Sequence, residues 1–459
     1  MRNLLSLFLL AGLLLAQCAP ESNAPERFTL EHTDPEIASM LHEVSADTLE
    51  SMIRTLAGFG TRNTLSDTES DESGIGAARR WIHSEMERYS RDSGGRLQVE
   101  FHGYMEEAGG RIPEEVEIVN VVGTLPGTDP NDDRIFVVSG HYDSRASNGS
   151  DGEVSAPGAN DDASGTAAVM EMARVMSQHE FPATLVFMAV AGEEQGLLGA
   201  RNWAAEAAEE GKNIAGMITN DIIGNHAAED GALTDPWRVR LFAEGVPPQS
   251  QLDGQTVRYL QTGGESDMPT RQLARTLKEV AESYIPEMDV SIIYRKDRFL
   301  RGGDHSAFLE QGYPGVRFSE PHEEFRHQHQ DIRVEDGVQY GDLPEFADYD
   351  YVERVTRVNL AGLANLARSP RPPQSVGVLT TRLENDTRLR WEPSESPHLD
   401  GYEVLWRETT SPVWQHREFV GDQTEFTAEL ISKDNWIFGV RSVSNGSHVG
   451  VAVYPFPTR

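Results

Sequence analysis

Short apolar runs alternate with helical patterns along most of the chain, and this alternation restricts the possible fold more than any other feature. The apolar runs have the length of single buried strands and cover residues 117–127, 134–144, 183–194, 215–225 and 313–320. Residues 162–179 and 350–369 carry apolar side chains at three- and four-residue spacing, which is typical of helices. We therefore predict an α/β domain over residues 31–368, with a mixed, mostly parallel sheet flanked by helices.

The pattern changes after the stiff segment PRPP at residues 370–373. Short alternating segments separated by turn residues then follow to the C-terminus, and they predict a small all-β sandwich over residues 375–459, with residues 369–374 as the linker. Val376, Trp391, Tyr402 and the strand GVRSVS (439–444) resemble a fibronectin type III domain. We expect such a module to act as a spacer or a weak adhesion unit.

The N-terminus has the composition of an export signal. One arginine precedes an apolar run from Leu4 to Ala16, and small and polar residues follow. We predict a signal peptide over residues 1–18 and a flexible tail over residues 19–30. Cys18, the only cysteine, follows LLLAQ, which resembles a bacterial lipoprotein box except that Gln17 replaces the usual small residue. Export to the periplasm or the extracellular space is expected, and a lipid anchor at Cys18 and simple cleavage both stay open.

The charge balance excludes two classes of partner. Lys and Arg number 40 against 74 Asp and Glu, for a formal net charge of −34. Such a field repels nucleic acid and anionic membrane surfaces, so we expect no nucleic-acid partner and no membrane contact other than a lipid anchor at Cys18.

Ionisable side chains stand at or just beyond the ends of the apolar runs: His141, Asp143, Glu193, Glu194 and Asp221. In open α/β sheets, ligand-binding groups gather beyond the carboxyl ends of the strands, so these residues are expected to converge. Two adjacent glutamates at the end of an apolar strand are costly to bury unless a metal or a partner compensates them. One can ligate a metal while its neighbour serves as a general base.

Two further segments extend this pattern. Asp161 and Asp162 lie in APGANDDASG (156–165), whose small residues let the backbone pass close to a bound ion, although an aspartate-rich helix cap is the alternative. His327, His329 and Asp331 follow the last apolar run, and we expect a metal ligand among them. Oxygen and nitrogen donors without thiolate suit Zn²⁺.

The chain resembles the co-catalytic zinc exopeptidase family of bacterial leucyl aminopeptidases, whose relatives include glutamate carboxypeptidase and glutaminyl cyclase. The resemblance spans about residues 30–368 and rests on an ordered set of motifs: GHYDS (140–144), APGANDDASG, GEEQGLLG (192–199), ND (220–221), GGDHSAF (302–308), GYPGV (312–316) and HQHQD (327–331).

By motif, the resemblance implies two zinc ions that share Asp161. His141 and Asp221 would complete the first site, and Glu194 and His327 the second. Glu193 would be the general base and Asp143 the carboxylate behind His141, and a cis peptide is expected before Asp162. His327 is preferred to His329 because the family pattern places an aspartate four residues after the ligand, here Asp331.

The resemblance also concerns the substrate pocket. Asp304 and His305 match a motif whose residues support the metal ligands or line the substrate pocket in the family, and a purely structural role is an equal alternative for both. Arg326 occupies the position of a tyrosine found in many relatives, so a substrate contact made by that tyrosine is not expected here.

The expected activity is release of N-terminal residues from peptide substrates by a secreted zinc aminopeptidase. A carboxypeptidase of the same family is the main alternative. A glutaminyl cyclase-like acyltransferase and a non-catalytic binding scaffold are further ones. The sequence predicts neither the preferred residue nor the oligomeric state.

Overall fold

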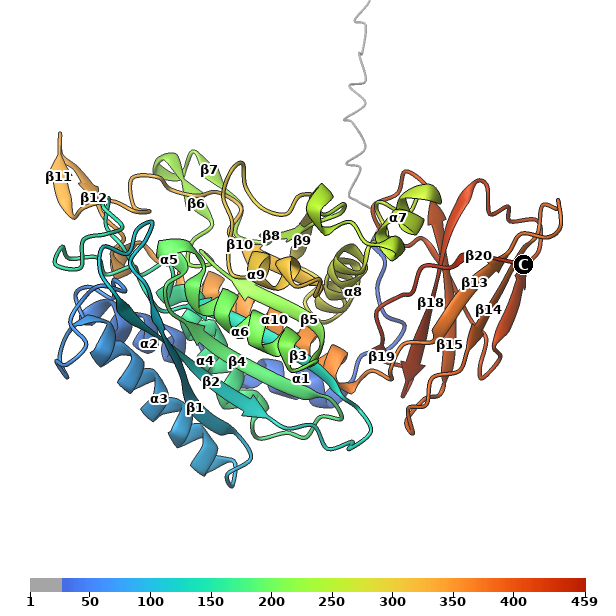
Figure 1. The fold of residues 1–459 in the computed structure, drawn as a ribbon, viewed down its shortest axis with the longest axis horizontal. Coiled ribbons are helices and arrows are strands. Elements are labelled where there is room, and N and C mark those ends of the chain that lie inside the picture. The colour runs from blue at the N-terminus through green and yellow to red at the C-terminus, as the bar shows by residue number, and fades with distance from the viewer. Residues whose placement is uncertain (1–26) are drawn as a thin grey trace, which may run out of the picture.

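An eight-stranded mixed sheet forms the centre of the larger part of the molecule (Figure 1). The computed structural model describes residues 27–459. Across the sheet, the strands follow the order β1 (Gln98–Glu106), β2 (Val116–Leu125), β4 (Thr184–Val190), β3 (Arg134–His141), β5 (Asn213–Asn220), β10 (Gly315–Ser319), β8 (Arg238–Ala243) and β9 (Asp289–Ile293).

The four central strands, β4, β3, β5 and β10, run parallel to one another. Antiparallel pairs occur towards the edges, between β1 and β2, β2 and β4, and β10 and β8. The predicted mixed sheet is confirmed, and all five predicted strands are present.

Helices cover both faces of this sheet. One face packs against a large core to which the buried side chains of Phe136 and Val138 contribute, whereas Val137 belongs to a separate core on the other face. This alternation along β3 is the two-residue period of a strand buried on both sides. The helices of the first face are α1 (Pro35–Glu43), α2 (Ala46–Gly58), α3 (Gly74–Asp92), α4 (Ala163–Met176), α8 (Pro269–Tyr284) and α10 (Tyr349–Arg368). Those of the second face are α6 (Leu198–Glu209) and α9 (His305–Glu310).

Shorter elements lie in the connections. They are the one-turn helix α5 (Glu193–Gly196), helix α7 (Gly254–Gln261), the hairpins β6 (Ala227–Ala228) with β7 (Leu233–Thr234) and β11 (Arg333–Glu335) with β12 (Val338–Tyr340), and the 3₁₀ turns Glu229–Gly231, Gln249–Gln251 and Pro344–Phe346.

Two four-stranded sheets form the C-terminal part. The first contains β17 (Glu425–Ala428), β14 (Thr387–Glu392), β13 (Gln374–Leu379) and β20 (Phe456–Thr458); the second contains β16 (His416–Phe419), β15 (Gly401–Glu408), β18 (Trp436–Ser444) and β19 (His448–Val449). Their facing side chains share one core, in which Leu389 and Trp391 of one sheet meet Val404 and Val440 of the other. The predicted sandwich is therefore confirmed, and its likeness to fibronectin type III stays a prediction.

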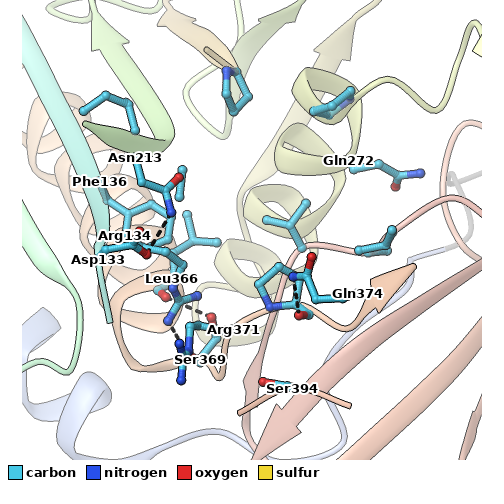
Figure 2. Close-up of a pocket in the computed structure, with 18 of the residues that line it drawn as sticks. Asp133, Arg134, Phe136, Asn213, Gln272, Leu366, Ser369, Arg371, Gln374 and Ser394 are labelled. Carbon is cyan, nitrogen blue, oxygen red and sulfur yellow. Dashed lines mark hydrogen bonds between the residues drawn. The ribbon is translucent and has the colours of Figure 1, made fainter. Parts of the chain in front are cut away.

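The sandwich packs closely against the α/β domain through buried charged groups. Arg407 on β15 forms a two-point ion pair with Asp267 at 2.7 and 3.0 Å, and Arg441 on β18 bonds Glu279 of α8 at 2.6 and 2.8 Å. All four residues are less than 5 % exposed. A cavity of about 940 Å³ is lined by both parts of the chain, by Arg134, Asn213 and Gln272 of the α/β domain and by Gln374 and Ser394 of the sandwich (Figure 2).

Several N-terminal predictions fall on residues that are not described. The predicted signal peptide with Cys18 and most of the tail precede residue 27. The last tail residues are held in place: the Leu30 amide donates to Ser283 Oγ at 2.8 Å, and the Arg417 guanidinium stacks 4.3 Å from the Phe28 ring centre. From Arg27 onward, no helix has both the length and the apolar character needed to cross a membrane.

Candidate metal centre

Three neighbouring strands deliver the predicted site residues to one edge of the sheet. His141 is the last residue of β3, Asp221 directly follows β5, and Glu193 begins α5 just after β4. Because these strands are parallel and adjacent in the order β4, β3, β5, their carboxyl ends lie side by side.

Helix α4 starts against the same edge because two glycines allow a close approach. A Cβ on Gly140 would lie 2.4 Å from the carbonyl carbon of Gly165, and one on Gly165 would lie 2.2 Å from the Asn220 oxygen. Asp162 then fastens the segments together. Its carboxylate accepts the amides of His141 at 3.0 Å, Gly165 at 3.0 Å and Ile222 at 3.2 Å. Asp161 is thereby placed between β3 and β5, and the Asp161–Asp162 peptide is cis, as expected.

The first donor cluster contains His141, Asp161 and Asp221, all buried. The Nε2 atom of His141 lies 3.1 Å from Oδ1 of Asp161 and 3.9 Å from Oδ1 of Asp221. The second cluster contains Asp161, Glu194 and His329. The Nε2 atom of His329 lies 2.9 Å from Oδ2 of Asp161 and 2.8 Å from Oε1 of Glu194. Asp161 thus turns one carboxylate oxygen to each cluster.

The histidine of the second cluster corrects the prediction of His327. His329 takes the place expected for His327, which instead stacks on Phe346 with ring centres 3.8 Å apart and planes 8° apart. Asp331, which guided the choice, bonds the Ser147 hydroxyl at 2.7 Å. A positive φ of 55° at His329 turns the chain so that its imidazole reaches the carboxylates.

Asp143 supports both clusters. His141 Nδ1 lies 3.1 Å from the backbone oxygen of Asp143 and 3.6 Å from its carboxylate, which orients the ring so that Nε2 faces the first cluster. The same carboxylate accepts the amides of Glu193 and Glu194, both at 3.2 Å. Glu193 lines the cleft above the clusters, and no donor among the described residues bonds its carboxylate.

The electrostatics of the two clusters are strongly negative. Burial lowers the pKa of His141, but Asp143, Asp161 and Asp221 outweigh it and hold that pKa well above its usual range. Burial also lowers the pKa of His329, but the carboxylates of Glu194 and Asp161 outweigh this effect and raise that pKa to about 10. Burial, followed by the charges of Asp221 and Glu194, raises the pKa of Glu193 well above its usual range although His141 opposes it.

These donors fit two divalent cations. Each cluster offers one imidazole and two carboxylates with ligand atoms within 4.8 Å of one another. Both imidazoles are driven towards the charged form, so each position attracts positive charge. Nitrogen and oxygen donors without thiolate are the ligands expected for zinc.

Sequence reasoning missed the residues that contact the candidate metal ligands and fix their positions. Arg317 Nη2 lies 2.9 Å from Oδ1 of Asp221, Gln328 Nε2 donates to Asp161 Oδ2 at 3.0 Å, and Asp342 accepts the Asp161 amide at 2.7 Å. Only Gln328 lies in a recognised motif, HQHQD. The alternation of Gln with His in that motif is the one sequence feature that could have indicated its role.

The remaining predicted residues lie nearby but outside both clusters. Asp304 is fully buried, and its carboxylate oxygens have no hydrogen-bond partner among the described residues; burial and the nearby Asp143 and Asp221 carboxylates outweigh His141 and raise its pKa to about 7. His305 Nε2 lies 2.8 Å from the Lys296 carbonyl oxygen. Arg326 pairs with Glu324 and Asp230.

Comparison with known proteins agrees with this architecture. The model of Peptidase family M28 matches residues 120–335. A protein described as a probable zinc metalloprotease of Leptosphaeria maculans is 49% identical over 424 residues, which cover 92% of this chain and 97% of that protein.

Solved structures share the fold at low sequence identity. The LapA aminopeptidase of Legionella pneumophila is 18% identical and has a TM-score of 0.50, over 81% of each chain. The glutaminyl cyclase of Macrostomum lignano is 14% identical and has a TM-score of 0.51, over 74% of this chain and 96% of that one. With the close zinc metalloprotease relative, these similarities confirm the expected relationship: the chain belongs to peptidase family M28, a family of zinc metallopeptidases, and is a peptide-bond hydrolase.

Proposed function

We propose that the protein is an exported aminopeptidase that removes N-terminal residues from peptides with two zinc ions and Glu193 as the general base. The observation that carries the proposal is the position of Asp161 between two complete donor clusters. The LapA aminopeptidase shares the fold, which supports the proposal that residues are released from the N-terminus of the substrate. Export rests on the apolar N-terminal run alone.

Each described side chain has a defined task in this reaction. His141, Asp161 and Asp221 would hold one ion, and Asp161, Glu194 and His329 the other. Bound zinc would polarise the scissile carbonyl and lower the pKa of the attacking water. Asp143 keeps His141 and the two glutamates in register through its contacts to all three.

Glu193 is suited to moving the proton. It lies beside Glu194, yet it belongs to neither donor cluster, and its carboxylate faces the cleft. In the proposed reaction it takes one proton from the attacking water and passes it to the nitrogen of the leaving amine as the peptide bond breaks. This transfer leaves a carboxylic acid on the released residue and an amine on the shortened peptide, and the proton of the acid is then lost to solvent or to the amine.

The decisive experiment combines zinc content with hydrolysis of leucyl and other aminoacyl anilides by wild type and Glu193→Gln. We expect two zinc ions per chain in both proteins, because Glu193 is not a donor. Activity should fall by about 10²–10⁴-fold in the variant, the usual contribution of a positioned proton-transfer group.

Other outcomes would select the alternatives. Two zinc ions without anilide hydrolysis, but with release of C-terminal residues, would favour a carboxypeptidase. A single zinc with cyclisation of N-terminal glutamine would favour a glutaminyl cyclase, an activity named for the Macrostomum lignano structure. A protein without zinc or turnover would contradict an enzymatic role.

A further inference from the structure

The cleft above the donor clusters has basic walls, although the chain as a whole carries a net charge of −34. The cleft encloses about 510 Å³ and is open to the candidate ligands Asp161, Glu194, Asp221 and His329. Six basic side chains also line it: Arg111, Arg145, Arg201, Lys296, Arg298 and Arg301. Glu193 and Glu310 complete the acidic lining, so six basic side chains meet five carboxylates, a far more positive balance than that of the whole chain.

Several of these cations already have partners. Arg201 pairs with Glu310 at 3.1 and 3.2 Å, and Arg145 donates to the carbonyl oxygens of Ala146 and Ser147. Arg298 bonds Asp297 at 3.0 Å and Glu323 at 2.9 Å. Arg145 also lies 3.8 Å from the Glu194 carboxylate, and Arg111 donates to the Glu194 carbonyl oxygen. Each of these four cations therefore has a partner at or near the second donor cluster or in the wall of the cleft.

Lys296 and Arg301 differ from them. Among the described residues, no carboxylate lies within 4.0 Å of the Lys296 ammonium, and none of its three donors makes a hydrogen bond. Arg301 uses only Nη1, which bonds Glu323 Oε2 at 2.8 Å and Gln328 Oε1 at 3.4 Å. Its Nε and Nη2 donors are left for another acceptor.

The acidic groups behind this wall do not neutralise it. Glu323 alone serves three guanidinium groups, those of Arg240, Arg298 and Arg301. Asp297 serves Arg298 and Arg317. The free donors of Lys296 and Arg301 thus add to a local excess of positive charge.

The segment that carries both residues is held beside the first donor cluster. The Lys296 carbonyl oxygen is 2.8 Å from His305 Nε2, and the Gly302 carbonyl accepts a bond from Arg317 at 3.0 Å. Gly303 lies so near the cluster that a Cβ there would be 3.1 Å from Oδ2 of Asp221. A group bound by this segment would therefore lie near the scissile bond.

We propose that Lys296 and Arg301 bind a carboxylate of the substrate, so that the enzyme prefers peptides with an anionic group next to the scissile bond. This inference rests on the proposed aminopeptidase function and specifies its substrate class. Charge-assisted hydrogen bonds from ammonium and guanidinium groups are the strong contacts that carboxylates make in proteins.

Two kinds of peptide present such a carboxylate. One has an N-terminal aspartate or glutamate, and the other is a short peptide whose terminal carboxylate lies one residue beyond the scissile bond. The chemistry recognised is the same, so the experiment needs one arm for each.

The first arm compares glutamyl with glutaminyl anilide, and the second compares the dipeptide Ala-Leu with its C-terminal amide. The measured quantity is the ratio of kcat/KM for the acid to that for its neutral analogue. In at least one arm, we expect wild type to favour the acid by about tenfold or more, a difference of about 1.4 kcal/mol.

The variants assign that preference to the two residues. The double variant Lys296→Met with Arg301→Gln should bring the ratio close to unity, whereas Lys296→Arg with Arg301→Lys should retain most of it because both charges remain. Arg201→Gln is the matched control, because that guanidinium lines the same cleft but is already paired with Glu310. It should leave the ratio at the wild-type value.

Binding of products provides a readout that does not require turnover. Titration calorimetry of the zinc-loaded protein should show tighter binding of glutamate than glutamine, or of leucine than leucinamide, in the arm that shows the preference. The double variant should lose this difference. If no substrate is hydrolysed but the acid still binds through these residues, the proposed function fails and the carboxylate site stands.

The opposite result overturns the inference alone. If neutral anilides are hydrolysed and neither arm favours the acid, the peptidase function stands and the carboxylate site does not exist. The same conclusion follows if the double variant keeps the wild-type ratio and binding preference.

Discussion

The guanidinium of Arg317 lies 2.9 Å from the carboxylate of Asp221, the residue that completes the first donor cluster. Arg317 is fully buried on β10, next to β5, at whose end Asp221 lies. Its other terminal nitrogen is 2.9 Å from Asp297, another buried carboxylate. Arg317 therefore fixes the position of one candidate ligand and compensates two buried charges.

We expect Arg317→Met to destabilise the protein strongly. Removal of one partner from a buried ion pair leaves an uncompensated charge and typically costs about 3–5 kcal/mol. The free energy of unfolding from urea titrations would measure this loss. Arg91→Met is a suitable control because Arg91 is 66% exposed and its nearest carboxylate is 3.8 Å away, so a change within about 0.5 kcal/mol is expected. A loss equal to that of the control would show that Arg317 is not needed to balance Asp221.

Variants of the two histidines in the HQHQD segment should differ in their zinc content. His329→Ala removes a donor from the second cluster, so we expect about one zinc ion per chain and loss of anilide hydrolysis. His327→Ala removes only the stacking on Phe346 and should retain two ions. Elemental analysis of both variants beside wild type measures the difference. Retention of two ions by His329→Ala would restore the original choice of His327.

The strand-end residues of the site could be predicted because they depend on local pattern. His141, Glu193, Glu194 and Asp221 follow apolar runs, and parallel strands bring their ends together by geometry. The choice between His327 and His329 could not be made this way, since both lie in an irregular loop without a strand or helix period. The positive φ at His329 directs its imidazole, rather than that of His327, towards the carboxylates. No sequence rule predicts this backbone conformation for a histidine.

Residues that act through long-range contacts were also beyond sequence reasoning. Arg317 is 96 positions from Asp221, and Asp342 is 181 positions from Asp161, whose amide it accepts. Neither belongs to a motif, and the sequence around an arginine in a buried strand does not predict which carboxylate it contacts. The same holds for Arg407 and Asp267, which join the two parts of the chain through a buried ion pair.

Removal of the sandwich should therefore destabilise the α/β domain. A chain that ends at Arg368 leaves Asp267 without Arg407 and Glu279 without Arg441, and exposes the surface that packed against the sandwich. We expect a lower midpoint of thermal unfolding and reduced soluble yield. The point variant Arg407→Met tests the ion pair without the truncation. It should lower the free energy of unfolding by about 1.5–3 kcal/mol, because Arg275 still pairs with Asp267 at 3.2 Å. A truncated chain with wild-type melting temperature and anilide hydrolysis would support the spacer hypothesis.

Protonation of Glu324 at low pH should destabilise the loop that carries His329. The Glu324 carboxylate accepts the Arg326 guanidinium at 2.8 Å and the Glu229 amide at 2.8 Å, and the side-chain and backbone groups of Arg326 hold the pKa of Glu324 at about 2 although burial opposes them. A lowered pKa means that the folded state favours the charged form. The stabilisation is therefore complete above the ordinary glutamate pKa of 4.5 and is lost as the pH falls through about 2.

Comparison of wild type with Glu324→Gln tests this dependence. At pH 7 the variant should be less stable to urea, because it lacks the charge that Arg326 pairs with. As the pH falls below 4.5, the wild-type protein loses that advantage while the variant has none to lose, so the difference in free energy of unfolding should shrink. Glu85→Gln, which removes a partly exposed partner of Arg88 on α3, is the control for general charge effects. A difference that stays constant from pH 7 to pH 3 would show that Glu324 does not stabilise the loop as a charged group.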